Sequence, residues 1–489
     1  MGTISSAFSL ITQALDTDQA ALNVVANNVA NASTPGYTRE TPGWQENAPV
    51  VINGMAYGAG VTETGATSVR DRVLTQRLDQ QQQLASASGT RLAALNTIQA
   101  LFTPDTGSPN AAAGDIGNDI SSFFSSFSSL EADPTNSALR QQVLSAASTL
   151  AGDISNAAAS LNSQRAALDQ ETAGVATQVN ALTAAIAQMN LQIESASPNS
   201  DAGVLEDMRQ QALSQLSQLI GINQVTTSGN GLSITTTSGQ LLVSEGTSVP
   251  LTTGTVDGVT HFYLGATDVT SQLSGGGGEL GGYLTARDQD IPNVLSSLDQ
   301  LAFGISVEVN AQNHAGTDLN GASGADIFSS PTQVTGSAAA MSVVMTDPDG
   351  IAAAAAGAAA GDNSNATAMA DLADQADPPI LNGLTLPDGS TLASGQTLLS
   401  GLAPSGFYSN FVTTLGSTVA QVQTENTAQN ASVTQLQTQN NALSSVNLND
   451  EAASLQQFER SYQAASEVFT ILNTVIAAAL NLGVQTAVS

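Results

Sequence analysis

The sequence predicts a mainly α-helical protein with inserted β structure. Paired terminal coiled-coil helices flank an elongated helical-bundle domain, which carries smaller β-rich outer domains. Three observations lead to this fold class. Both chain ends carry apolar residues at heptad spacing, much of 69–221 has helical periodicity, and 226–275 alternates and is rich in Thr and Gly. Because aromatic residues make up only 4% of the chain, we expect long helices packed through small side chains.

The first heptad pattern lies in the N-terminal segment. Its positions are separated alternately by four and three residues, and all of them except Asp18 are apolar. A polar residue on such a seam can set the register of the helices at a cost in stability. The apolar positions, which we expect to form an assembly interface, are Ile4, Phe8, Ile11, Leu15, Leu22, Val25 and Val29.

The sequence NNVANASTPGY predicts the end of this helix and a tight turn. Asparagine tolerates the left-handed conformation in which many helices end, so the helix should finish between residues 28 and 31. Thr34 precedes proline, which disfavours helical geometry, and the Pro-Gly pair suits the central positions of a type II turn. The turn motif, in which the tyrosine folds back on the helix end, consists of Asn28, Asn31, Pro35, Gly36 and Tyr37.

The second heptad pattern lies near the C-terminus. Asn449 or Asp450 can cap a helix there, and the acidic first turn suits the helix dipole. Termini with patterned apolar faces favour two helices that pair with each other and with neighbouring copies of the chain. The interface residues expected on this helix are Leu448, Leu455, Phe458, Tyr462, Phe469, Leu472 and Ile476.

Changes in composition and periodicity divide the chain into seven segments. An alanine run at 352–360 is expected to be a surface insertion or a weak helix. Breaks in the helical pattern are expected at 103–110 and 195–203. The segments are an N-terminal assembly helix with its turn and an extended linker (1–68), a helical core domain (69–225), a β-rich segment (226–282), a helix that returns to the core (283–317), a β or mixed outer domain (318–400), a core-domain helix (401–445) and a C-terminal assembly helix (446–489).

The charge balance argues against several classes of partner. The formal net charge is −31, and all ten basic residues are arginines. Nucleic acids and anionic membranes bind clustered positive charge, so we expect neither as a partner. Cysteine is absent, no stretch approaches the ~20 apolar residues of a membrane span, and the N-terminus does not have the pattern of a cleaved signal peptide.

The sequence also lacks the patterns of an active site. The two histidines, His261 and His314, have no evident catalytic partners, and no phosphate loop or nucleophile elbow is present. Asp318, Asn320 and Asp326 are spaced somewhat as in a calcium loop, but the terminal glutamate is missing, which favours a turn. We therefore expect no enzymatic activity, no cofactor and no metal site.

Both ends of the chain resemble a known family. ALNVVANNVANASTPGYTRE at 21–40 and VNLNDEAASLQQFERSYQAASEVFTILNTVIAAALNL at 446–482 resemble the terminal signatures of the flagellar axial proteins, which include rod, hook and hook-associated proteins. The interior, above all GELGGYLTARDQD and the sequence that follows it to residue 328, resembles the hook–filament junction members. In the C-terminal signature, the positions where the family carries like residues are Leu448, Glu451, Ala452, Leu455, Tyr462, Ala464, Ala465 and Leu472.

The resemblance implies a structural subunit of the bacterial flagellum. Such a subunit would polymerise through its terminal helices and adapt the flexible hook to the filament. It would leave the cell without signal cleavage. The implied partners are copies of the chain itself, the hook protein, the second hook–filament junction protein, a cytoplasmic export chaperone and the flagellar export apparatus. The alternatives are another axial protein (a hook protein or the second junction protein), a secreted adhesin or surface-layer protein, and an enzyme carried in 226–400.

Overall fold

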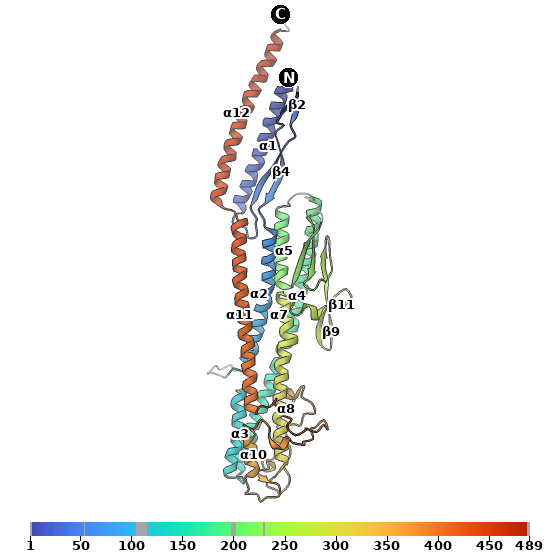
Figure 1. Cartoon of the computed structure of the whole chain (residues 1–489), viewed down its shortest axis with the longest axis vertical. Helices are drawn as coiled ribbons and strands as arrows, with labels where there is room; N and C mark the ends of the chain where they lie inside the picture. Colours follow the sequence, from blue (N-terminus) through green and yellow to red (C-terminus); the bar gives the residue numbers. More distant parts are fainter. Residues whose placement is uncertain (1, 53, 104–114, 197–201, 228–229, 487–489) are drawn as a thin grey trace.

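The structure is a computed structural model that describes residues 2–52, 54–103, 115–196, 202–227 and 230–486. It does not describe the side chains of residues 2–5, 52, 196 and 479–486. The molecule is elongated, and the helices at the two chain ends project together from one end of a helical body (Figure 1). The predicted class, mainly α with paired terminal helices and smaller β regions, is confirmed. Most of the two predicted breaks lies outside the described residues.

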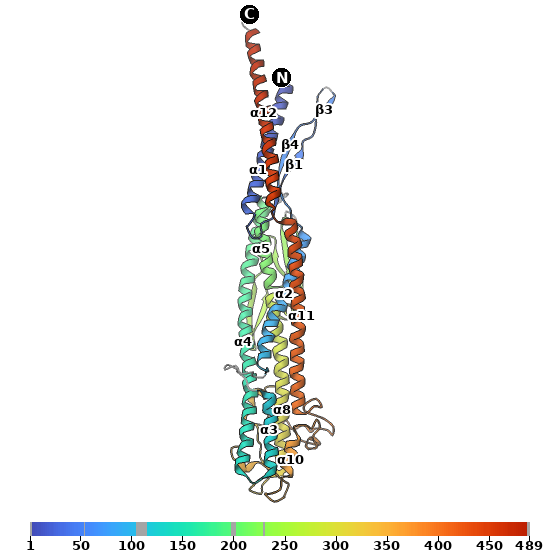
Figure 2. The ribbon, with the colours of Figure 1, turned by 90° about the vertical axis from the view of Figure 1, so that its left-hand side faces the viewer.

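The projecting part consists of two helices and a β ribbon. Helix α1 (Gly2–Asn31) and helix α12 (Leu448–Thr486) lie side by side (Figures 1 and 2). Strands β1 (Glu40–Glu46) and β4 (Val61–Ser68) form an antiparallel ribbon that packs on α1. The ribbon continues into a small hairpin.

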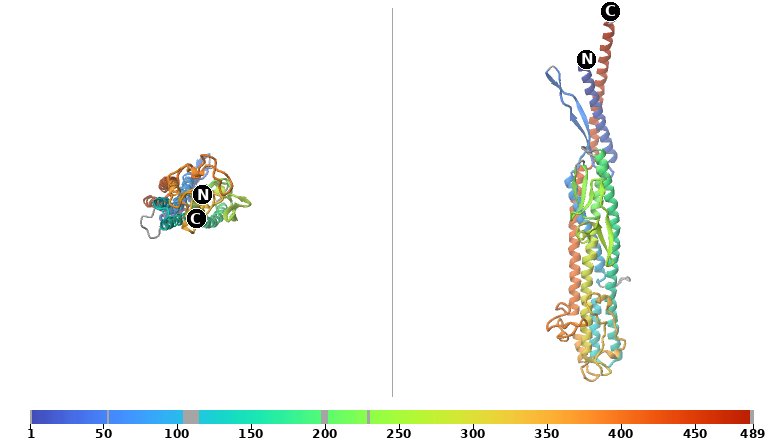
Figure 3. Two further views of the ribbon diagram at one scale, coloured as in Figure 1. Left: turned by 90° about the horizontal axis from the view of Figure 1, so that it is seen from below. Right: turned by 90° about the vertical axis from the view of Figure 1, so that its right-hand side faces the viewer.

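That hairpin consists of strands β2 (Val50–Ile52) and β3 (Met55–Tyr57), which pair with each other in antiparallel register. Gly54 has a φ of +79° at the turn, a backbone conformation that glycine adopts without strain. The tip of the hairpin points away from both terminal helices (Figures 2 and 3).

The body is a bundle of long helices that run along its axis (Figure 2). Asp71 begins the first of them, because its carboxylate accepts hydrogen bonds from the backbone nitrogens of Val73 and Leu74. Apart from α5 (Val204–Leu219), which contributes to a second core, the apolar faces of these helices form one continuous core, in which Phe123 and Phe127 are fully buried. The helices are α2 (Arg72–Ala100), α3 (Ile116–Ala132), α4 (Ser137–Ala196), α5 (Val204–Leu219), α8 (Ile291–His314) and α11 (Pro404–Ser444).

Short strands cover the side of the bundle near α4 and α5 (Figure 1). They form a four-stranded sheet in the order β5-β6-β7-β8 and a three-stranded sheet in the order β11-β10-β9. Their inward side chains, such as Ile234 and Phe262, form a second core with α4, α5 and α7. The elements are β5 (Ile222–Thr226), β6 (Leu232–Thr236), β7 (Leu241–Ser244), β8 (Thr247–Ser248), β9 (Leu251–Val256), β10 (Val259–Leu264), β11 (Thr267–Asp268), α6 (Thr270–Leu273) and α7 (Gly278–Thr285).

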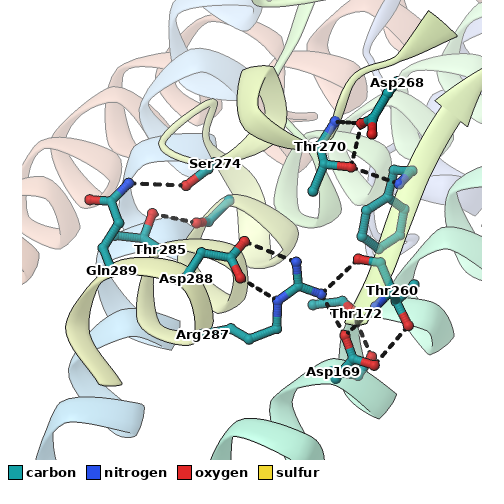
Figure 4. A network of polar contacts seen from close by, with 12 residues as sticks. Asp169, Thr172, Thr260, Asp268, Thr270, Ser274, Thr285, Arg287, Asp288 and Gln289 are labelled. Atoms are coloured by element: carbon teal, nitrogen blue, oxygen red, sulfur yellow. Dashed lines mark hydrogen bonds and ion pairs between the residues drawn. The ribbon is translucent and has the colours of Figure 1, made fainter. Parts of the chain in front are cut away.

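A buried arginine joins this β region to the bundle (Figure 4). Arg287 lies in a π-helical turn (Ala286–Asp290) between α7 and α8, and its side chain is 1% exposed. Its Nη1 donates to Asp169 Oδ1 of α4 at 2.5 Å and to the carbonyl oxygen of Thr260 in β10 at 2.9 Å. Asp169 also accepts hydrogen bonds from the backbone nitrogen and hydroxyl of Thr260. Burial opposes ionisation of Asp169, but the hydrogen bonds from Thr260 and the charge of Arg287 hold its pKa below the usual value.

The segment predicted to be a β or mixed outer domain, 318–400, lies at the far end of the body and combines loops with short helices and strands. Its described residues are mostly loops, and apolar side chains such as Phe328, Met341 and Met369 belong to the core of the helical bundle. The regular elements here are β12 (Gly316–Thr317), α9 (Ser337–Ala340), β13 (Ala354–Ala355) and α10 (Ser364–Asp371).

The expectation for the alanine run at 352–360 is correct for its second half, where Ala356, Ala359 and Ala360 are exposed, and wrong for its first half. Ala352, Ala353 and Ala354 are neither helical nor on the surface, because they are buried in an extended segment. Two buried asparagine side chains satisfy its backbone. Asn313 Oδ1 accepts from the nitrogen of Ala352 at 2.8 Å, and Asn365 Nδ2 donates to the oxygen of Ala352 at 2.6 Å. Small side chains let this segment fit between packed elements.

Candidate assembly interface

Helices α1 and α12 pack antiparallel along their apolar seams. The ring centroids of Phe8 and Phe469 lie 4.8 Å apart, near the free end of the pair. Closer to the body, the ring of Trp44 in β1 meets the ring of Phe458 edge-on at 6.0 Å. Aromatic pairs in these geometries stabilise by ~0.5–1.5 kcal/mol beyond their buried area. The terminal helices therefore contact each other and the β ribbon. Among the described residues, none of theirs belongs to either core of the body.

The predicted interface residues are only partly covered within one chain. Val25 is buried, Val29, Leu448 and Tyr462 are exposed, and the side chain of Ile4 lies outside the described residues. The half-buried residues are Phe8, Ile11, Leu15, Leu22, Leu455, Phe458, Phe469, Leu472 and Ile476. One partner helix thus leaves a large part of both seams accessible.

Helix geometry accounts for the exposure of Leu448. A strict heptad repeat drifts by ~20° per heptad on a straight helix, and Leu448 lies three heptads before Phe469. It has therefore rotated away from the partner helix by the start of α12. On α1 the most buried line runs beside the heptad seam and shares Val25 with it. That line consists of Thr17, Ala21, Val25 and Asn28.

The predicted turn follows α1 directly. The helix ends at Asn31, and the backbone nitrogen of Tyr37 donates to the oxygen of Thr34 at 3.2 Å. Gly36 has a φ of +81°, as the third residue of a type II turn requires. The expected left-handed asparagine is wrong, because Asn28 and Asn31 both keep helical backbone. Their side chains make hydrogen bonds instead.

Asn28 is the centre of a buried hydrogen-bond network at the base of the helix pair. Its Oδ1 accepts from the hydroxyl of Tyr37 at 2.8 Å and from the backbone nitrogen of Glu40 at 3.0 Å. Its Nδ2 donates to the oxygen of Glu40 at 2.8 Å and to Glu451 Oε2 of α12 at 3.1 Å. The amide side chain is thereby fully satisfied, and it connects the turn, the ribbon and both terminal helices.

Glu451 completes the network from the C-terminal side. Its side chain is 1% exposed, and its other oxygen accepts from Nε of Arg39 at 2.6 Å. The backbone nitrogen of Arg39 donates to the oxygen of Ser444 at the end of α11. Burial and the nearby charges of Glu40, Asp207 and Glu451 raise the pKa of Tyr37 to about 12, so its hydroxyl remains a donor.

A second set of charged residues attaches the turn to the body. Thr38 donates from its backbone nitrogen at 2.9 Å and from its hydroxyl at 2.7 Å to the carboxylate of Asp207 in α5. Arg70 pairs with Asp207 and, at 2.6 Å, with Glu206. Arg72 also reaches Glu206, at 3.1 Å. We call the two sets together the polar joint, which consists of Asn28, Tyr37, Thr38, Arg39, Arg70, Arg72, Glu206, Asp207 and Glu451.

Sequence patterns alone did not indicate this joint. One signal was available, since arginines are scarce and the first three of the ten, Arg39, Arg70 and Arg72, all precede residue 73. Buried charges need partners, so a scarce cation beside a predicted turn was a candidate for a structural ion pair. The acidic partners lie more than 130 positions away, which the sequence does not indicate.

Two regions of the chain match known protein families. The family described as flagellar hook-associated protein FlgK helical domain matches residues 108–328, and the family described as flagella basal body rod protein matches residues 12–38. Flagellar hook-associated protein 1 of Escherichia coli is 25% identical over 98% of this chain and 100% of its own length. The chain belongs to the flagellar hook-associated protein 1 family.

Two further comparisons extend this result. Flagellar hook-associated protein 1 of Bacillus subtilis is 25% identical over 96% of both chains. The solved structure of the flagellar hook junction protein FlgK from Burkholderia pseudomallei covers 74% of this chain and 99% of its own, with a TM-score of 0.60 and 19% identity. That likeness shows a shared fold. The family is a structural one and belongs to the extracellular flagellum.

The described residues show neither a metal site nor a membrane-spanning helix. They contain no group of three or more His, Asp or Glu side chains placed to hold a metal ion. Within them, no helix has both the length and the hydropathy needed to cross a membrane. The two histidines each contact one aspartate, His261 with Asp268 and His314 with Asp326, both at 2.7 Å.

Proposed function

We propose that this hook-associated protein builds the hook–filament junction by polymerising through α1 and α12. The observation that carries the proposal is the incomplete burial of their seams. Most of the interface residues are half-buried in one chain, although α12 already covers α1 along its length. Fully burying a large apolar side chain stabilises by ~1.5–3 kcal/mol, so neighbouring copies that complete this burial would stabilise a layer.

The specific partners are also part of the proposal. Further copies of the chain would form the layer, with the hook protein below it and the second junction protein above it. A cytoplasmic chaperone would cover the apolar seam of α12 before export, and the flagellar export apparatus would carry the chain out without signal cleavage. A cysteine-free chain suits this route, because no disulfide can form along it.

Substitution on the seam tests the proposal. Phe469→Asp places a charge at the contact with Phe8. Leu472→Asp places a charge on the same seam, three residues later. Either should abolish incorporation into flagella and leave the helical body folded. Thr470→Asp is the matched control, because Thr470 is exposed on the same helix. The readouts are circular dichroism of the purified chain and antibody labelling, which should mark one point along each flagellum in the control. Motile flagella containing the Phe469→Asp chain would exclude the seam as the assembly interface.

The proposal also concerns the free subunit. Ordering each backbone residue costs ~1–2 kcal/mol, and α1 and α12 contribute to neither core of the body in the described residues. We therefore expect both terminal helices to be largely disordered in a dilute monomer and to order on assembly. Limited proteolysis of the monomer should remove both ends and leave the body intact. Resistant ends would contradict this part of the proposal.

A further inference from the structure

The β2–β3 hairpin carries an apolar face that no described part of the chain covers. Val50 pairs with Tyr57 across the hairpin, and Met55 lies two residues before Tyr57, so these three side chains share one face. They are 52%, 48% and 59% exposed, respectively. Residues 47–62 contain no Asp, Glu or Arg, in a chain with a formal charge of −31. The hairpin is thus a neutral, apolar projection on an acidic protein.

The hairpin also needs a partner for its own stability. Its strands have three residues each and form a sheet of two strands only. An isolated two-stranded hairpin is marginally stable in water, and packing on another element is the usual way in which one is fixed. Within the chain its tip points away from α1 and α12 (Figures 2 and 3).

Helix α12 carries a second uncovered apolar surface. Val468, Ile471 and Val475 follow one another at three- and four-residue spacing, and they are 45%, 61% and 47% exposed. At ~100° per residue their centre lies roughly a quarter of a turn from that of Phe469, Leu472 and Ile476, which face α1. No charged residue follows Glu467 in this helix. We call these three residues the outer stripe.

The two surfaces match in chemistry and in position. Both are uncharged, so like-charge repulsion between acidic copies is weakest where they meet. Along the axis of the molecule, the hairpin tip is level with the upper half of α12, on which the outer stripe lies (Figure 2). Copies standing side by side at one height would bring the tip of one copy to the stripe of the next.

We propose that the hairpin face of one copy packs on the outer stripe of the neighbouring copy in the same layer. The contact rests on the proposed polymerisation and adds a lateral contact outside the α1–α12 seam. Three side chains on each side bury far less than the ~1,200 Å² of a stable interface. The contact therefore forms when neighbours are already held in a layer, and it does not make dimers in solution.

The absence of cysteine gives a direct test. Two full-length chains, one with Met55→Cys and one with Ile471→Cys, are produced together in cells that have no other copy of this protein. A short bismaleimide is then applied to isolated flagella. Only a contact between copies can join the two chains, so we expect a covalent dimer that is absent when either variant is produced alone. Met55→Cys with Thr470→Cys is the control pair, and it should give at least ~10-fold less dimer because Thr470 points away from the stripe.

The possible results distinguish a failure of this contact from a failure of the proposed function. If both variants are present in flagella and no dimer forms, or if the hairpin is joined to a protein of another mass, the contact is overturned and the junction role stands. If the unmodified chain itself is absent from flagella, the proposed function fails and this contact fails with it.

A second measurement does not use the cysteine variants, so it tests the contact even if those variants fail to fold. Met55→Asp should lower incorporation by ~10-fold or more, because an unpaired carboxylate in an apolar contact costs more than one tenfold step. Val51→Asp is the control, since Val51 is 66% exposed on the opposite face of the same hairpin. Equal incorporation of the two variants would overturn the proposal.

Discussion

Glu451 Oε2 lies 3.1 Å from the amide nitrogen of Asn28, which precedes it by 423 positions in the chain. The contact joins the last turn of α1 to the first turn of α12. Apolar heptad seams alone allow two helices to slide by whole heptads, whereas one buried polar contact can fix their register. We therefore expect this pair to decide which residues of α1 and α12 face each other before neighbouring copies are added.

Replacing Asn28 with alanine should impair assembly strongly, although it removes only one side-chain amide. Asn28→Ala removes the hydrogen bonds to the hydroxyl of Tyr37, to the backbone of Glu40 and to one carboxylate oxygen of Glu451. Each buried group left unpaired costs ~1–3 kcal/mol, so incorporation into flagella should fall by at least ~10-fold. Immunoblots of isolated flagella would measure the fall. Asn23→Ala, at an exposed position of α1, is the control, and equal incorporation of both variants would argue against the network.

A substitution at Gly36 should disturb the turn after α1 through backbone conformation alone. An added Cβ at Gly36 would meet no atom within 4 Å, yet its φ of +81° is unfavourable for a β-branched residue. Gly36→Val should therefore weaken assembly by the ~1–2 kcal/mol that a left-handed residue costs. Gly36→Asn is the control, because asparagine tolerates this conformation. If the two variants assembled equally poorly, the loss would have to come from something other than backbone strain.

The sequence predicted the elements whose periodicity extends over many residues. The heptads of α1 and α12, the helical body and the alternating strands after Gly221 all repeat often enough to be recognised. The end of α1 was also predictable, since Pro35 and Gly36 act locally. The prediction of a left-handed asparagine failed because Asn28 uses its side chain in a tertiary network.

Features that depend on distant partners could not be predicted. The alanine run at 352–360 has a composition that suits a surface or a helix. Only the packing around Asn313 and Asn365 makes its first part, residues 352–354, a buried extended segment. The pairing of Arg70 with Glu206 spans 136 positions. The inner ends of α1 and α12 meet at the polar joint only because the body folds between them, so the joint is a property of the three-dimensional structure.

The attachment of the β region should depend on Arg287. Arg287→Met removes a fully buried cation and leaves the carboxylates of Asp169 and Asp288 without it. Breaking a buried ion pair from one side costs ~3–5 kcal/mol, so the midpoint of urea unfolding should fall. Adding Asp169→Asn to this variant should restore part of the loss, because it removes one unpaired charge. A double variant that is less stable than the single one would argue against the ion pair as the cause.

The stability of the body should fall as the pH rises above about 5, because Glu308 is buried in α8 and one of its carboxylate oxygens has no hydrogen-bond partner. Burial raises its pKa from 4.5 to about 8. Below about pH 4 the carboxyl is protonated in both the folded and the unfolded chain, so it costs nothing. Between the two pKa values only the unfolded chain ionises, and the free energy of unfolding falls by ~1.4 kcal/mol per pH unit.

Glu308→Gln should remove this dependence. Near pH 7 the variant should be more stable than the parent chain by up to about 3 kcal/mol, the product of ~1.4 kcal/mol per unit and the interval from 4.5 to 7. Near pH 4 the two should be alike. Urea unfolding across this pH range measures both values, and Glu194→Gln, at an exposed helical position, is the matched control. A constant difference between Glu308→Gln and the parent at all pH values would indicate a packing effect rather than ionisation.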